Sequence, residues 1–302
     1  MRKVLTALAA ALVGLSLQAQ VQIPDFLRGM SREQLRNIGI ILPDTLKIWP
    51  SGAPDGYVPT LKPFGKDLSE ALLVVYPAPR PNGLCVVMCP GGGYEAETQD
   101  TEGHDPATWF NVRGITYAML QYRLPEGKHT YAPLSDAQEA IRILRSKAQD
   151  YGISSIGIMG CSAGGHLAST AATHYTVDCR PDFQILLYSV ITMDPAFTHE
   201  GSRKALLGPD PSEEMTERFS NEKQVTADTP PAFILACSDD RVVPVRNSTD
   251  YYMSMVEKGV SATLHIYPSG GHGFGFRETF LYRPEFTAEL DKWLREIIMK
   301  QL

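Results

Sequence analysis

The sequence predicts an α/β fold, in which a mostly parallel sheet carries helices on both of its faces. Short apolar runs rich in β-branched residues alternate along the chain with segments of helical periodicity. This alternation is typical of parallel strands joined by crossover helices. The length of 302 residues is sufficient for one large core. No internal repeat and no linker interrupts the pattern, so we expect one folded domain.

Seven apolar runs have the length and the composition of buried strands. They are Ala71–Tyr76, Leu84–Cys89, Ile115–Tyr122, Ser155–Met159, Phe183–Val190, Ala232–Cys237 and Ala262–Tyr267. Ser135 is a suitable N-cap for a helix that continues to Ala148. The spacing of apolar residues also predicts helices over Ser248–Gly259 and Pro284–Lys300.

Residues 1–19 have the pattern of a secretory signal peptide. Arg2 and Lys3 form a basic start, Val4–Leu17 is almost wholly apolar, and Ala19 is a small residue at the expected cleavage site. The apolar run is too short and wrongly flanked for a membrane span, and a buried N-terminal helix is the alternative interpretation. We therefore expect a secreted or periplasmic protein.

The remaining chain divides into an extension and a folded domain. Residues 20–47 are expected to form a mostly polar N-terminal extension with one amphipathic stretch, Ser31–Gly39, and residues 48–302 the domain. No later segment has the 18 unbroken apolar residues of a spanning helix, so we expect no integral membrane association.

Charge and cysteine content exclude several classes of protein. The net charge is −6 at pH 7 and the isoelectric point is about 5.7, which gives no basic surface for nucleic acid. The odd number of cysteines, 5, leaves at least one thiol unpaired. Cys85 and Cys89 share one face of a predicted strand, about 13 Å apart, too far for a disulfide. We expect no essential disulfide, no metal site and no cofactor.

Gly160-Cys161-Ser162-Ala163-Gly164-Gly165 is the sharpest motif in the sequence. It follows a predicted strand and continues into a predicted helix over His166–Ala172. A sharp strand-to-helix turn brings the backbone too close for side chains at the flanking positions, which explains the glycines. Such a turn exposes a serine as a nucleophile, so we predict this role for Ser162. A structural serine at a glycine-rich helix start is the alternative.

A serine nucleophile needs a base, and the base needs an orienting acid, in the chain order serine, acid, histidine for this kind of turn. Asp239 and Asp240 follow the strand Ala232–Cys237. Asp240 is preferred because it lies deeper in the loop, and Asp239 is the alternative. His272, between glycines, is the predicted base. His265 also follows the acid, but it lies within a predicted strand.

A third glycine-rich loop, Pro90–Tyr94, follows the strand Leu84–Cys89. Glycine N–H groups after a strand can stabilise the developing oxyanion of acyl transfer. We expect the N–H groups of Gly92, Gly93 and Ala163 to do so. An ordinary glycine turn is the alternative. A nucleotide-phosphate loop is disfavoured because its Gly-x-x-x-x-Gly-Lys pattern is absent.

These motifs together resemble a known family. Pro90–Tyr94, Gln121–Pro125, Gly160–Leu167, Asp239–Val245 and Ser269–Gly275 occur in the order found in secreted α/β-hydrolase esterases of the acetyl-xylan-esterase-like (BD-FAE-like) group. Ser135–Arg142 and Ser220–Val225 also look like stretches of that group. The resemblance extends from about residue 48 to the C-terminus. It implies an α/β-hydrolase fold and a triad of Ser162, Asp240 and His272.

The resemblance also implies an activity. Members of the group remove short acyl groups, typically O-acetyl, from xylan-type sugars through an acyl-enzyme, which makes an acylated carbohydrate the expected partner. Feruloyl or other small esters are alternative substrates. Two other classes share the fold: prolyl-oligopeptidase-type peptidases, which usually carry a β-propeller too large for this chain, and inactive carbohydrate binders.

Substrate contacts are less well specified by the sequence. Tyr94 and Phe274 adjoin the catalytic loops, so we expect them to stack on a sugar, whereas Trp109 is expected to pack a helix against the sheet. The segment Thr192–Pro231 is too long for a bare turn. It either covers the site and selects the leaving group or is a structural excursion.

Overall fold

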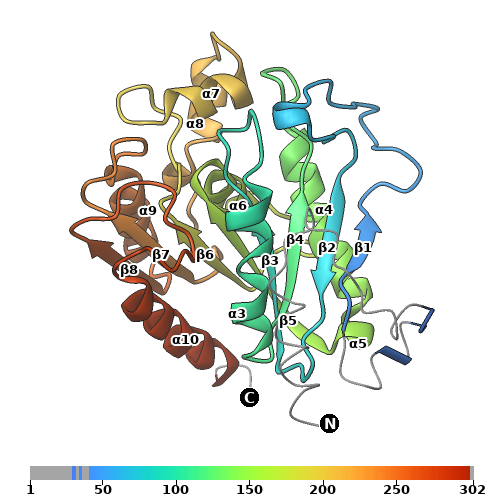
Figure 1. Cartoon of the computed structure of the whole chain (residues 1–302). Coiled ribbons are helices and arrows are strands. Elements are labelled where there is room, and N and C mark those ends of the chain that lie inside the picture. The colour runs from blue at the N-terminus through green and yellow to red at the C-terminus, as the bar shows by residue number, and fades with distance from the viewer. Residues whose placement is uncertain (1–28, 32–33, 36–40, 300–302) are drawn as a thin grey trace.

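The computed structural model describes residues 29–31, 34–35 and 41–299, and these form an eight-stranded sheet with helices on both faces (Figure 1). The strand order is β1-β2-β4-β3-β5-β6-β7-β8. The strands are β1 (Asp44–Lys47), β2 (Leu72–Tyr76), β3 (Gly83–Cys89), β4 (Thr116–Gln121), β5 (Ile153–Cys161), β6 (Phe183–Leu187), β7 (Ala232–Cys237) and β8 (Ala262–Tyr267). The predicted α/β class with a mostly parallel sheet is confirmed.

The strand register brings the carboxyl ends of the central strands to one edge of the sheet. β1 pairs with β2 and β2 with β4 in antiparallel fashion, and the strands from β4 across to β8 are parallel. Cys89, the last residue of β3, lies opposite Gly160 of β5. Cys161 in turn lies opposite Leu187 of β6. The loops that leave β3, β5 and β6 therefore begin side by side, where open α/β sheets bind ligands.

Two cores flank the sheet, because successive side chains of a strand point to opposite faces. In β3, Cys85, Val87 and Cys89 belong to the core under α4, α6 and α9. Leu84, Val86 and Met88 belong to the core under α3 and α10. This explains why β3 is an unbroken apolar run rather than an alternating one. All five cysteines are buried free thiols.

The helices have the following bounds. They are α3 (Ala107–Asn111), α4 (Ala132–Ser146), α5 (Ala148–Tyr151), α6 (Ser162–Thr173), α7 (Glu200–Leu207), α8 (Glu213–Arg218), α9 (Arg246–Glu257) and α10 (Arg283–Met299), with short turns η2 (Pro63–Gly65), η3 (Gln99–His104, a π-helix) and η4 (Asn221–Lys223). The segment Thr192–Pro231 thus carries α7, α8 and η4, and α7 and α8 lie at the upper end of the molecule in Figure 1.

Two of the motifs that carry the family resemblance meet in a buried ion pair. Arg123, from Gln121–Pro125, binds Asp136, from Ser135–Arg142, with 2.8 Å between Nη2 and Oδ1. The Arg123 Nη1 atom also donates to Asp55 at 2.7 Å, and the indole of Trp49 donates to Asp136 at 2.6 Å. The pair fastens α4 to the end of β4, so these motifs are structural.

Three expectations about elements need correction. β1 lies within the segment assigned to the extension, so the folded domain includes residues before 48. The sequence did not indicate β1, because a four-residue edge strand that alternates exposed and half-buried positions has few apolar residues. α4 begins at Ala132, and the Ser135 hydroxyl donates to the carbonyl of Tyr131 instead of capping the helix. β6 ends at Leu187, not Val190, because Tyr188 leaves the strand conformation with a φ of +38°.

The predicted signal peptide and most of the amphipathic stretch Ser31–Gly39 lie outside the described residues. Within the described part of the chain, none of the helices combines the length and the apolarity needed to span a bilayer.

Candidate active site

Ser162 sits on a sharp turn between β5 and α6, with a φ of +53°. The turn needs both flanking glycines. A β-carbon on Gly160 would lie 2.1 Å from the carbonyl oxygen of Gly164, and one on Gly164 would lie 2.0 Å from that of Cys89. Neither approach is sterically possible, so larger residues would open the turn. The strand–turn–helix context predicted for Ser162 is confirmed, and its backbone lies in a conformation that L-residues rarely adopt.

A hydrogen-bonded chain joins Ser162, His272 and Asp240. The Nε2 atom of His272 lies 2.8 Å from Ser162 Oγ, and Nδ1 lies 2.7 Å from Asp240 Oδ2. Because a carboxylate only accepts hydrogen bonds, Nδ1 carries the proton and Nε2 is left to accept from the serine hydroxyl. These are the contacts that a nucleophile, its base and an orienting acid require.

The environment of Asp240 keeps its carboxylate charged. The other oxygen, Oδ1, accepts hydrogen bonds from the N–H groups of Val242 and Val243 at 2.8 and 2.9 Å. Burial opposes the charged form, but the bonds with His272 and with these amides outweigh it and lower the pKa of Asp240 below its usual value. The acid is therefore ionised at neutral pH and able to orient the imidazole.

The structure separates the two candidate acids and the two candidate bases. Asp239 is exposed, and its carboxylate accepts from the N–H groups of Gly271 at 2.8 Å and Gly270 at 3.3 Å. It therefore holds the loop that carries His272 instead of facing the ring. His265 lies in β8, with its ring 5.0 Å from that of Phe233, and burial lowers its pKa. Its position in the strand removes it from the site.

The glycine loop after β3 passes directly beside Ser162. A β-carbon on Gly91 would lie 3.0 Å from that of Ser162. Gly92 and Gly93 have φ values of +131° and +69°, conformations that glycine adopts without strain. Within the described part of the chain, no residue accepts a hydrogen bond from the N–H of Gly92 or Ala163. The loop and the start of α6 thus place unpaired amides near Ser162, and the role of Gly92, Gly93 and Ala163 as oxyanion donors stays a prediction.

Glu102 and Tyr188 are part of the site although no motif indicated them. Glu102 is buried in the π-helix η3, and its carboxylate accepts from the Gly91 N–H at 2.7 Å and the Tyr188 hydroxyl at 3.0 Å. Burial raises the pKa of Glu102. The ring of Tyr188 meets that of His272 edge-on, with 4.9 Å between centroids. Glu95, Glu97 and Asp100 also follow the glycine loop, so nothing in the local sequence distinguishes Glu102 from them.

Tyr94 and Phe274 do not present their rings to a substrate, contrary to expectation. Tyr94 is 1% exposed, because its positive φ of +63° turns the ring inward, where its hydroxyl lies 2.9 Å from His166 Nδ1. Phe274 is 5% exposed and stacks on Phe280 with 4.1 Å between centroids. Both rings support the catalytic loops from within. Trp109 packs against Phe110 of its own helix and against Phe276 of a loop, beside the core under α3 and α10.

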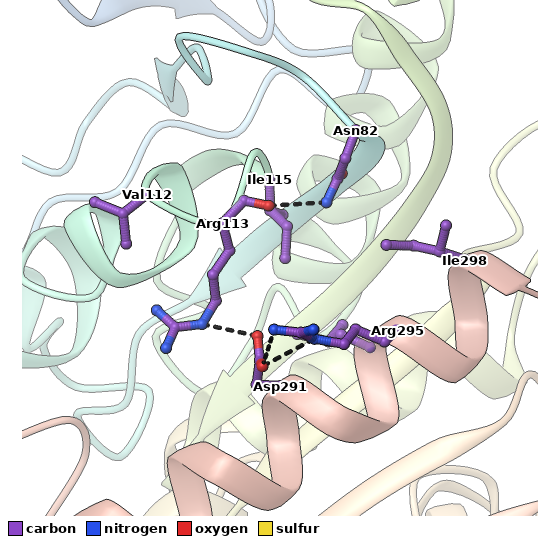
Figure 2. A pocket seen from close by; sticks show the side chains of 8 residues that line it. Asn82, Val112, Arg113, Ile115, Asp291, Arg295 and Ile298 are labelled. Carbon is purple, nitrogen blue, oxygen red and sulfur yellow. Dashed lines mark hydrogen bonds and ion pairs between the residues drawn. The ribbon is translucent and has the colours of Figure 1, made fainter.

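A cavity of about 300 Å³ lies elsewhere, at the opposite edge of the sheet (Figure 2). Its lining residues Asn82 and Ile115 come directly before β3 and β4, at the amino ends of these strands. Asp291 of α10, which also lines the cavity, forms ion pairs with Arg113 and Arg295, as the dashed lines in Figure 2 show. This cavity is separate from Ser162, which lies at the carboxyl end of the sheet.

Comparisons with known proteins address the family and the fold. The BD-FAE family model matches residues 75–185, which include the glycine loop and Ser162. The solved structure of an acetyl ester-xyloside bifunctional hydrolase from Caldicellulosiruptor lactoaceticus superposes with a TM-score of 0.75 at 36% identity, covering 85% of this chain and 97% of that one. The chain belongs to the α/β-hydrolase esterase family. The family resemblance and the fold predicted from the sequence motifs are thereby confirmed.

Two proteins with similar sequences are longer than this chain. The acetylxylan esterase of Xylanibacter ruminicola is 39% identical over 247 residues, which are 79% of this chain and 51% of the relative. The endo-1,4-beta-xylanase B of Butyrivibrio fibrisolvens is 36% identical over 208 residues, 63% of this chain and 32% of the relative. The chain thus spans about half the length of the first relative and a third of the second.

Proposed function

We propose that this α/β-hydrolase is a serine esterase that removes short acyl groups, O-acetyl above all, from plant polysaccharide or oligosaccharide such as acetylated xylan. The observation that carries the proposal is the hydrogen-bonded chain from Ser162 through His272 to Asp240, set at the strand-to-helix turn beside a glycine loop. The choice of acetyl and of a xylan-type sugar is supported by the names of the relatives, an acetylxylan esterase and an acetyl ester-xyloside hydrolase.

The first step forms an acyl-enzyme. His272 Nε2 takes the hydroxyl proton as Ser162 Oγ bonds to the ester carbonyl carbon, and the carbonyl oxygen becomes an oxyanion. The N–H groups of Gly92, Gly93 and Ala163 are the donors proposed to bind it. The intermediate collapses with loss of the sugar oxygen, which leaves as an alcohol with the proton from His272. Asp240 stays ionised throughout and stabilises the charged imidazole.

The second step returns the free enzyme. His272 takes a proton from a water molecule whose oxygen bonds to the acyl carbon. The same amides stabilise the second oxyanion, and its collapse breaks the bond to Ser162 Oγ. The serine regains its proton from His272, and acetic acid leaves and ionises to acetate in solution. Every proton moves through one imidazole, so a single histidine at hydrogen-bond distance from the serine is sufficient for both steps.

Export of the protein is part of the proposal. The basic start, the apolar run and the small residue at Ala19 support cleavage of a signal peptide and a secreted or periplasmic location. In that location the enzyme would have access to a polysaccharide that is too large to enter a cell.

The test is acetate release from acetylated xylo-oligosaccharides, run beside a p-nitrophenyl ester series from acetate to octanoate. We expect acetate release, activity that falls as the acyl chain lengthens, and none in Ser162→Ala. Hydrolysis of the small esters without acetate release would move the substrate to feruloyl or other esters. Turnover by Ser162→Ala equal to that of the unmodified protein would overturn the site.

A further inference from the structure

We propose that His199 is a specificity-determining residue, which donates a hydrogen bond from its Nε2 atom to the sugar portion of the ester. His199 belongs to the segment Thr192–Pro231 and stands directly before α7. The inference rests on the proposed function and names a contact that the triad and the oxyanion donors do not supply.

The position of His199 brings it to the catalytic loops. Its Cε1 atom lies 4.0 Å from where a β-carbon on Gly93 would be, so its ring lies next to the glycine loop. Burial lowers the pKa of His199, and the nearby charge of His272 lowers it further, while Glu95 and Asp240 oppose this. His199 thus lies close enough to His272 to be affected by its charge, although 73 positions separate the two residues, and the lowered pKa of His199 favours the neutral form of its ring.

The tautomer of His199 is determined by its contacts. Nδ1 accepts from the backbone N–H of Ser202 at 3.2 Å and lies 2.8 Å from the Ser202 hydroxyl. Because a backbone N–H can only donate, Nδ1 of the neutral ring carries no proton, and the hydrogen is on Nε2. Among the described residues, none accepts a hydrogen bond from this Nε2, and the ring is only half-buried. The site therefore contains an unused donor of known identity.

The loop that presents this donor is held rigidly. Asn247, a buried residue of α9, accepts from the N–H groups of Ile191 and Thr192 at 2.9 and 3.1 Å. Its amide nitrogen donates to the carbonyl of Phe197 at 3.0 Å. The Thr198 hydroxyl closes the loop onto the Thr192 carbonyl at 2.6 Å. A donor that is already positioned loses little conformational freedom when a substrate binds.

Chemistry assigns the donor to the alcohol side of the ester. An acetyl group has one polar atom, its carbonyl oxygen, and this oxygen is already the ligand of the proposed oxyanion donors. Its methyl group accepts no hydrogen bond. A sugar leaving group carries hydroxyl and ring oxygens that do. An N–H group beside the glycine loop can therefore bind only the sugar. On this proposal, the segment Thr192–Pro231 contributes a polar contact to the leaving group.

The decisive variant is His199→Asn. The Asn Oδ1 atom keeps an acceptor for the Ser202 N–H, so α7 remains capped, but the side chain is too short to donate from the Nε2 position. We expect the ratio of kcat/KM for acetylated xylo-oligosaccharides to kcat/KM for p-nitrophenyl acetate to fall roughly tenfold, mainly through KM. His199→Gln places an amide N–H nearer the Nε2 position and should recover part of the ratio.

The outcomes separate this inference from the proposed function. An unchanged ratio in His199→Asn overturns the sugar contact, as does an equal loss on both substrates, which would indicate a structural role. If His199→Asn does not fold, the ratio in His199→Gln decides: a partial loss on the oligosaccharides supports the contact, and an unchanged ratio overturns it. Failure of the unmodified protein to release acetate from the oligosaccharides overturns the proposed substrate before any variant is compared.

Discussion

The carboxylate of Glu102 accepts the N–H of Gly91 at 2.7 Å, and this bond ties the glycine loop to a buried acid. The second carboxylate oxygen accepts the hydroxyl of Tyr188, whose ring packs edge-on against His272. One side chain thus links the loop of the proposed oxyanion donors to the packing of the proposed base. A π-helix such as η3 often marks a functional position, and here it places Glu102.

Glu102→Gln should therefore lower kcat more than it changes KM. A glutamine has one carbonyl oxygen, so it can accept from Gly91 or from Tyr188 in the present geometry, but its amide cannot replace the second acceptor. We expect kcat on p-nitrophenyl acetate to fall by roughly 10- to 100-fold, with a modest drop in melting temperature. A rise in KM at unchanged kcat would show that Glu102 shapes substrate binding instead of the oxyanion loop.

Ser162→Ala should abolish turnover and leave the fold intact. Loss of the nucleophile in a triad typically costs a factor of about 10⁴ or more in kcat/KM. The hydroxyl's hydrogen bond in the described structure is with His272, so its removal leaves no other group unpaired. Thermal unfolding and ester hydrolysis measured together provide the check. A loss of stability of several kcal/mol would indicate a structural serine.

The two neighbouring aspartates form a matched pair of variants. Asp240→Asn replaces a charged acceptor of the His272 Nδ1 proton with a neutral amide, and we expect a loss of about 10³- to 10⁴-fold in kcat. Asp239→Asn keeps an oxygen that can accept from Gly271, so its activity should stay within about fivefold. The reverse order of the two effects would contradict the assignment.

Glu97 should make stability depend on pH. Burial raises its pKa from 4.5 to about 8, although bonds from Tyr122 and Gln99 oppose the shift. Between these two values the folded state binds more protons than the unfolded state, so stability falls as pH rises through this window. Glu97→Gln should remove the contribution of this carboxyl group to the loss of stability between these pH values.

The measurement is the free energy of unfolding in urea at pH 5 and pH 8. We expect the difference between the two pH values to shrink by roughly 1–4 kcal/mol in Glu97→Gln. Glu70→Gln, at an exposed glutamate that pairs with Lys47, is the control and should leave the difference unchanged. An identical difference in the unmodified protein and in Glu97→Gln would contradict the prediction.

Local sequence was sufficient for the parts of the site whose chemistry is local. The turn around Ser162 needs glycines within two residues, and the loop of His272 needs glycines beside it, so both appear as motifs. The central strands are likewise visible, because each buries both faces and is mostly apolar. β1 was missed because an edge strand of four residues buries little.

Tertiary structure alone decided the contacts between distant residues. Which aspartate faces His272 depends on how the loop after β7 folds, since both carboxylates follow the same strand. Tyr94 looked available to a sugar, but the backbone turned it into the core. Glu102 and His199 carry no local signal, because their partners come from other loops. The sequence by itself determined the fold class and the turn that carries Ser162, because both depend on neighbouring residues. Packing determined what surrounds Ser162, because burial and orientation are properties of the whole molecule.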